Sequence, residues 1–134
     1  AERKTRFYIA MKMSDRRAET MENAIVAALS AFPPQLVKTI TCDRGTEFAN
    51  WRRIEERLHC EVYFADPYCA WQKGTNENLN GLLREFYPKG RNLSRVAPAT
   101  LKRNLALLNA RPRKVLYFHS AQELWDFELN SCCT

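Results

Sequence analysis

The sequence has no long hydrophobic run and no recognisable leader. Its longest nearly uninterrupted apolar stretch, Ala24 to Phe32, is less than half of the roughly 20 residues that a helix needs to cross a bilayer. The chain begins at Ala1, and no basic and then apolar segment precedes the part that we expect to fold. We therefore expect neither a transmembrane segment nor a secretion signal, and no membrane partner.

Cysteines are few, and their pattern fits neither a disulfide framework nor a zinc ribbon. There are five, an odd number; none stands in a C-x-x-C pair, and Cys132 is followed directly by Cys133. A bond between two adjacent cysteines would be strained. Reduced thiols in a cytoplasmic protein are the expectation that remains. Internal repeats and low-complexity tracts are also lacking.

The charge that is present is uneven. The 134 residues, one domain by length, carry a net charge of +6. From Arg84 to Lys114 nine basic residues stand against one acid, whereas from Asp43 to Glu77 seven acids stand against five bases. An acidic centre followed by a basic half suits a metal site beside a polyanion. The alternative is a basic surface that is merely solvated.

Hydrophobic periodicity predicts strands that alternate with helices. Thr5 to Met13 alternates like a strand with one buried face, formed by Phe7, Ile9, Met11 and Met13. An amphipathic helix follows over 18–32, with Ser14 or Asp15 as its cap, and Pro33 and Pro34 end it.

The rest of the chain continues the same alternation. Strands are predicted over 36–42 and 61–65, and helices over 48–58, 75–87 and 98–108. Ser120 and Glu123 form a capping box that opens a last helix. This order predicts an α/β fold with one mixed sheet and helices packed on it.

Two acids stand where chemistry is often placed. Asp43 directly follows a β-branched strand, and Glu77 lies in the polar first turn of a helix. Together the two carboxylates could bind Mg²⁺ or Mn²⁺ through oxygen. Each also has a simpler interpretation: an Asp just before Arg-Gly forms turns, and a Glu in a first turn complements the helix dipole.

The most specific motif of the sequence is the Gly-Thr-Asn-Glu-Asn-Leu-Asn-Gly run that holds Glu77. Together with several other segments, it closely resembles the catalytic core of bacterial DDE transposases of the insertion sequence thirty family, within the retroviral-integrase-like superfamily. The spacing between Asp43 and Glu77 is also the one that this family shows between its last two acids. The resemblance rests on residues 2–7, 41–48, 63–68, 71–84, 87–90 and 108–114.

The resemblance implies a ribonuclease-H-like mixed sheet flanked by helices, and a single integrase-like catalytic core over residues 1–134. It implies a DDE-type polynucleotidyl transferase or endonuclease in which the acids hold two Mg²⁺ or Mn²⁺ ions. These would activate water or a 3′-hydroxyl to attack DNA at transposon ends and target, in DNA integration and recombination. The implied location is the bacterial cytoplasm, at the nucleoid.

The sequence departs from this family in three ways. The family uses three acids, and the strand that bears the first would lie upstream of residue 2, so we expect a fragment without its first strand that is inactive by itself. Asp15 does not fit that motif. Arg44 stands where Asn is expected, and Gln72 where an acid is commoner. Because neighbours of a missing central strand would lack a pairing partner, a homodimer is one expectation.

Basic residues near Glu77 and in the basic half are candidate DNA contacts, namely Lys73, Arg84, Lys89, Arg91, Arg111, Arg113 and Lys114. Gly81, on the same helix face as Glu77, would let a DNA backbone approach closely, or else would serve tight helix packing. Tyr68 and Trp71 could stack on an unpaired base, or anchor their loop to the core.

Two other functions are compatible with these residues. One is a DNA-binding or assembly module without catalysis, derived from a transposase; the other is a structure-specific nuclease of the same fold. A titration with Mg²⁺ that follows Asp43 and Glu77 would separate the first of these from a catalytic core.

Overall fold

The computed structural model describes residues 1–132, with the backbone alone for Ala70 and Trp71. The contacts divide the chain into two compact units. We call Met11–Lys73 the inserted unit, and Ala1–Ala10 with Gly74–Thr134 the split unit, because the first interrupts the second in sequence. Each is described by itself. None of the described helices is both long and apolar enough to cross a bilayer.

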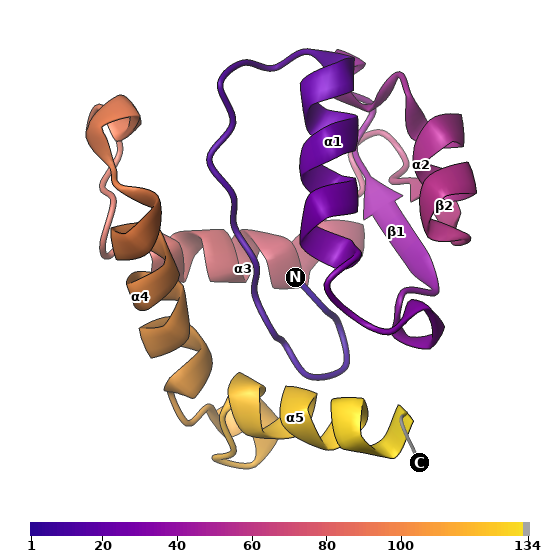
Figure 1. The fold of residues 1–134 in the computed structure, drawn as a ribbon. Coiled ribbons are helices and arrows are strands. Elements are labelled where there is room, and N and C mark those ends of the chain that lie inside the picture. Colours follow the sequence, from indigo (N-terminus) through magenta and orange to yellow (C-terminus); the bar gives the residue numbers. More distant parts are fainter. Residues whose placement is uncertain (133–134) are drawn as a thin grey trace. The chain divides into compact units, whose positions relative to one another are not determined.

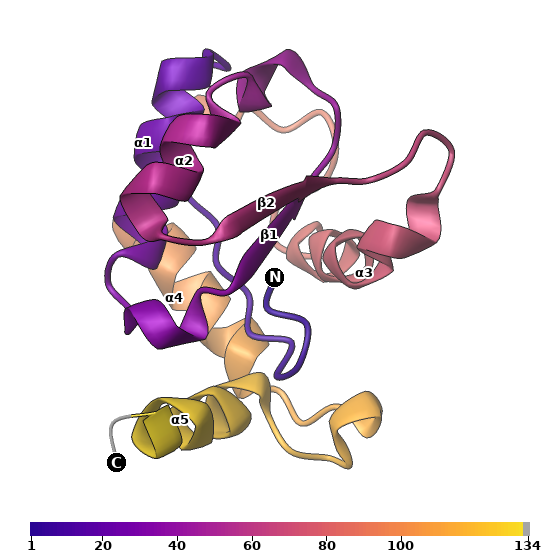
Figure 2. The same ribbon diagram turned by 90° about the vertical axis from the view of Figure 1, so that its right-hand side faces the viewer.

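The inserted unit contains a pair of parallel strands and two helices. Its elements are α1 (Ala18–Leu29), β1 (Thr39–Cys42), α2 (Trp51–Leu58) and β2 (Glu61–Phe64). The two strands lie side by side (Figure 2), with Thr39 opposite Glu61 and Cys42 opposite Phe64. Within the described residues this is the whole sheet. The α/β expectation agrees with this arrangement.

Apolar side chains from all four elements form the core of the inserted unit. Ile54 and Leu58 of α2 pack with Cys42 and Val62 of the strands, and Leu29 of α1 packs against this cluster. The apolar stripe read from the sequence of α2 is thus confirmed. The predicted end of α1 before Pro33 and Pro34 is confirmed as well, since the helix stops at Leu29.

One buried charge joins α1 to α2. The side chain of Glu22 is only 6% exposed, and its carboxylate accepts hydrogen bonds from Arg57 and from Asn50, each at 3.0 Å. The hydrogen bond from Arg57 is the main cause of a lowered pKa for Glu22. The carboxylate is therefore held in its charged form where the two helices meet.

The split unit contains three helices, α3 (Gly74–Leu83), α4 (Pro98–Ala110) and α5 (Ala121–Cys132), which Figure 1 colours from pink to yellow. Leu79 of α3 and Leu108 of α4 are fully buried against Tyr8. The predicted capping box is confirmed: Ser120 Oγ accepts from the Glu123 N–H, and Glu123 Oε2 from the Ser120 N–H, both at 3.1 Å.

The strand predicted over Thr5 to Met13 is wrong. Arg6 has a φ of +63°, which breaks the extended run, and no strand is assigned to this segment. Tyr8, on the face predicted to be outward, is buried at 6% exposure, whereas Met11 is 48% exposed. Alternation shows that a segment has two faces, but its packing partner decides which of the two is buried.

The side chain of Asn109 takes the place of a neighbouring strand. Its Oδ1 accepts the Tyr8 N–H, and its Nδ2 donates to the Tyr8 carbonyl, each at 2.9 Å. Asn109 itself is buried. The backbone of Tyr8 is therefore satisfied by one amide side chain from α4, which a pattern of apolar residues does not reveal.

Candidate active site

Asp43 follows the last residue of β1, and two donors hold its carboxylate. Oδ1 accepts the Gly45 N–H at 2.9 Å, and Oδ2 lies 3.3 Å from the Lys73 ammonium. The Gly45 hydrogen bond is the main cause of a lowered pKa for Asp43, and Lys73 lowers it further. With 53% of its side chain exposed, Asp43 offers solvent an oriented, ionised carboxylate.

A second carboxylate, that of Glu47, lies beside the turn after Asp43. Its carboxylate lies over Gly45, at the place where a Cβ would stand. Because this carboxylate is the far end of a flexible side chain and Gly45 has a φ of −66°, the contact does not by itself require glycine. Burial raises the pKa of the Cys42 thiol to about 11, with smaller contributions from Asp43 and Glu47, while Lys73 opposes them. Glu47 thus shares the electrostatic surroundings of Asp43. Glu47 was not among the predicted site residues, although the Asp-x-Gly-x-Glu spacing was the available signal.

Glu77 lies in the first turn of α3, in the split unit, and its side chain is exposed. Within residues 1–132 it has no hydrogen bond or ion pair. The structure therefore leaves this carboxylate available to solvent at the start of a helix. The metal ion that Asp43 and Glu77 are predicted to share stays a prediction.

The donor chemistry at Asp43 fits a hard divalent cation. An ionised, solvent-facing carboxylate is the ligand that Mg²⁺ and Mn²⁺ prefer, and Glu77 offers the same group. In neither unit do three His, Cys, Asp or Glu side chains of the described residues gather to form a complete metal site. Lys73 holds one Asp43 oxygen, so an incoming cation would exchange with this ammonium.

The predicted DNA contacts differ in their surroundings. Lys73 is paired with Asp43, and Arg111 with Glu85 at 2.9 Å. Arg91 lies over the Tyr87 ring, 5.8 Å from its centroid. The remaining four have no acidic partner among the described residues. Arg84, Lys89 and Lys114 are exposed, and Arg113 is half-buried and lines a pocket. Their contact with DNA stays a prediction.

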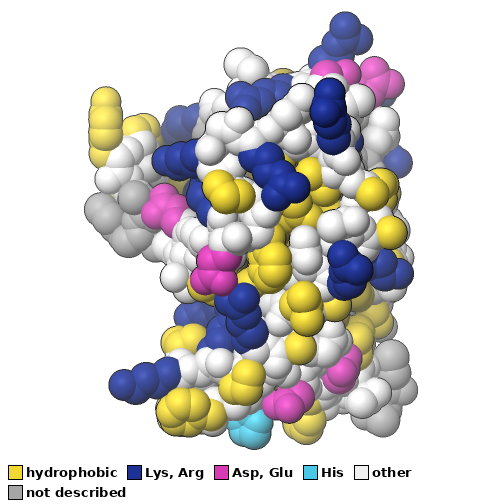
Figure 3. Space-filling view, turned by 90° about the vertical axis from the view of Figure 1, so that its left-hand side faces the viewer, with side chains coloured by type: hydrophobic (Ala, Val, Ile, Leu, Met, Phe, Trp, Pro, Cys, Tyr) yellow, Lys and Arg dark blue, Asp and Glu magenta, His cyan; other side chains and the backbone are white. Residues whose placement is uncertain are grey.

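Basic side chains share the surface with other types. On the face drawn in Figure 3, Lys and Arg lie among acidic and apolar side chains rather than as one uninterrupted basic surface.

Gly81 and Tyr68 have open surroundings. A Cβ at Gly81 would meet nothing within 4 Å, so the tight helix packing considered for it is wrong among the described residues. Tyr68 is 100% exposed and does not anchor its loop, which leaves its ring free to stack. The Trp71 side chain, like Cys133, lies outside the described residues. Cys42, Cys60, Cys69 and Cys132 are free thiols, as predicted.

Comparison with known proteins gives one family and several relatives. The integrase core domain family matches residues 2–70, about half of the chain. A probable transposase for insertion-like sequence element IS1161 of Streptococcus salivarius is 38% identical over 125 residues, 93% of this chain and 35% of that protein.

Two further relatives carry similar names. Transposase InsI for insertion sequence element IS30C of Escherichia coli (strain K12) is 36% identical over 92% of this chain and 32% of its own length. The transposase for insertion sequence element IS1086 of Cupriavidus metallidurans is 39% identical over 89% of this chain and 35% of its own length. The chain spans about a third of the length of the curated relatives it matches.

Proposed function

The chain belongs to the integrase core family, and from this premise we propose that it forms part of the catalytic core of a transposase. The activity is metal-dependent cleavage of DNA at transposon ends, followed by joining of those ends to target DNA. The observation that carries the proposal is the similarity to transposases over about nine-tenths of the chain. The placement of Asp43 at the end of β1 supports it.

Asp43 and Glu77 are the proposed metal ligands. The Gly45 N–H orients the Asp43 carboxylate and keeps it ionised at neutral pH, and Glu77 presents a second carboxylate at the start of α3. Two Mg²⁺ or Mn²⁺ ions, when bound, would stabilise the attacking and the leaving oxygens of an in-line displacement at phosphorus. Lys73 neutralises the Asp43 carboxylate, and a metal ion would displace the Lys73 ammonium from Asp43 Oδ2.

DNA is the proposed partner, reached through the exposed basic residues of the split unit. Three of these cationic groups are exposed to solvent, those of Arg84, Lys89 and Lys114. When such groups neutralise DNA phosphates, the release of condensed counterions favours binding. The similarity to transposases does not favour the alternative of a module that binds DNA without catalysis. Because the resemblance implies a third acid upstream, we expect residues 1–134 alone not to cut DNA.

The test is nicking of supercoiled plasmid by the chain and by a version extended to the relatives' length, with Mn²⁺ present. Asp43→Asn and Glu77→Gln should each abolish nicking by the extended protein. Glu19→Gln is the matched control for Glu77, because both are exposed glutamates in the first turn of a helix. If Glu19→Gln and Glu77→Gln lose activity equally, Glu77 serves only its helix dipole.

A titration with Mg²⁺ separates the catalytic core from the non-catalytic module. Binding should shift the backbone amide resonances around Asp43 and Gly45, and Asp43→Asn should remove the shifts. Glu56→Gln, an exposed acid of α2, should retain them. Shifts that are absent, or equally weak in both variants, would favour the non-catalytic module.

A further inference from the structure

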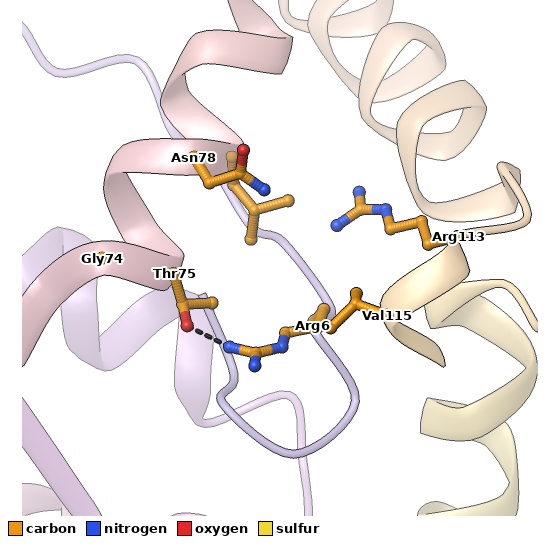
Figure 4. A pocket seen from close by; sticks show the side chains of 7 residues that line it. Arg6, Gly74, Thr75, Asn78, Arg113 and Val115 are labelled. Carbon is orange, nitrogen blue, oxygen red and sulfur yellow. Dashed lines mark hydrogen bonds between the residues drawn. The ribbon is translucent and has the colours of Figure 1, made fainter. Parts of the chain in front are cut away.

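The split unit contains a pocket at the start of α3. Its volume is about 240 Å³, and its lining includes Arg6, Thr75, Asn78, Arg113 and Val115. Figure 4 shows the Arg6 and Arg113 guanidinium groups both pointing toward α3, with Asn78 facing Arg113 across the open space. The whole lining lies within this one unit.

The two guanidinium groups bring positive charge that no acid balances. Arg6 donates a hydrogen bond to Thr75 Oγ1, and Arg113 Nη2 donates to the Leu108 carbonyl at 3.4 Å. Among residues 1–132 neither has an ion-pair partner, and the pocket lining holds no carboxylate. The Arg113 Nε is fully buried and has no hydrogen-bond partner in the described part of the chain.

The electrostatics of Arg113 confirm that this charge is unrelieved. Burial lowers the pKa of its guanidinium, and the nearby charges of Arg111 and Arg6 lower it further. Arginine nevertheless remains protonated in proteins. Two cations that line one pocket, with no carboxylate in its lining, favour the binding of an anion there.

A phosphate group meets this demand in shape and charge. Guanidinium forks match the spacing of phosphate oxygens and bind them in pairs. The Asn78 side-chain amide is a further donor in the pocket lining. At ~30 Å³ per water molecule, the pocket has room for a phosphate group and some of its hydration.

We propose that this pocket holds one backbone phosphate of bound DNA between Arg6 and Arg113. The choice of DNA as the source rests on the proposed function, whereas the binding of a phosphate group does not. Since Glu77 lies in the same first turn as Thr75, a phosphate held here would fix the DNA backbone relative to the helix that carries this acid.

The first arm of the test uses inorganic phosphate and two isosteric variants. Asn78→Asp places a negative charge in the pocket lining, and Asn76→Asp places the same charge in the same turn, outside that lining. In Asn76→Asp, titration with phosphate should still shift the backbone amide resonances of α3. In Asn78→Asp, the affinity for phosphate should be at least about tenfold weaker. Neither variant removes a buried group, so both should fold. Equal affinities of the two variants for phosphate would overturn the proposal that this pocket binds it.

The second arm uses a fluorescent DNA duplex. Arg6→Gln should weaken binding about tenfold and lower the log–log salt slope by about 0.9, the contribution of one phosphate contact. Arg3→Gln, an exposed arginine of the same segment, is the matched control and should change the slope far less. Equal effects of the two variants would overturn the proposal. Phosphate binding by a chain that binds no duplex would overturn DNA as the ligand, and would count against the proposed function.

Discussion

The inserted and split units satisfy their backbones in different ways. In the inserted unit, β1 and β2 pair directly, and the helix that connects them packs on the same core. In the split unit, the backbone of Tyr8 is bonded instead by a side chain 101 residues away, that of Asn109. The sheet of the inserted unit thus forms between segments close in sequence, whereas the backbone of Tyr8 in the split unit needs a side chain from a distant helix.

The candidate acids differ in a parallel way. Asp43, in the inserted unit, has its two oxygens held by Gly45 and Lys73, whereas Glu77, in the split unit, has no partner within residues 1–132. A carboxylate held by two hydrogen-bond donors favours one orientation toward a metal ion. A carboxylate without such partners can rotate to suit the position of the ion. The inserted unit therefore contributes the fixed half of the proposed site.

The largest loss of stability should come from truncating one buried side chain in the core of each unit. Ile54→Ala in α2 and Leu108→Ala in α4 remove side chains that are 1% and 0% exposed, and each should cost about 2–5 kcal/mol of unfolding free energy. Hydrogen exchange should show lost protection mainly in the unit that carries the change. If either variant lowers protection equally throughout, the two units do not behave separately.

Removing the Asn109 amide should be the next largest effect. Asn109→Ala leaves the Tyr8 N–H and carbonyl buried without partners, which should cost about 2–4 kcal/mol in urea unfolding. Asn104→Ala, on the same helix, removes one partly buried hydrogen bond to Tyr87 and should cost about 1 kcal/mol. Similar losses in both variants would show that the amide does not replace a strand.

Acid should weaken the inserted unit through Glu22. Its pKa is lowered in the folded state, so its contribution is present above the ordinary carboxyl range and is lost as pH falls through the folded-state pKa. The urea midpoint of the wild type should therefore drop more between pH 7 and pH 3 than that of Glu22→Gln. Glu56→Gln, with its exposed side chain, should retain the wild-type pH dependence. An identical drop in Glu22→Gln would contradict this role.

Gly81→Ala should give the smallest change, a gain of stability. The added methyl group meets open space, and alanine is favoured over glycine inside a helix by about 0.8–1 kcal/mol. Urea unfolding measures this gain, and duplex binding by the same variant measures whether DNA approaches that face. A loss of stability would mean that another part of the protein packs on Gly81.

Much of the inserted unit could be predicted because local patterns decide it. The β-branched residues before Asp43 and the apolar stripe from Trp51 to Leu58 each mark an element that packs close to its sequence neighbours. The segment around Tyr8 could not, since its alternation is compatible with either buried face. Its distant packing partners, among them Leu108 and Asn109, select one.

The sequence singles out the two candidate acids, which stay a prediction, but it does not reveal their surroundings. Strand end and helix start pointed to Asp43 and Glu77, whereas nothing local indicates that Lys73 pairs with Asp43. Arg6 was overlooked because it stands far from the basic run that begins at Arg84. Its position becomes informative only when the chain places it opposite Arg113.

The interrupted order of the split unit has a consequence for synthesis. As the chain leaves the ribosome, α1 to β2 can begin to associate once Lys73 has emerged, because all their partners are already made. Residues 1–10 have no such option, since the amide that receives Tyr8 lies 101 residues later. The Tyr8 N–H and carbonyl therefore gain the Asn109 amide as a partner only after α4 has been translated.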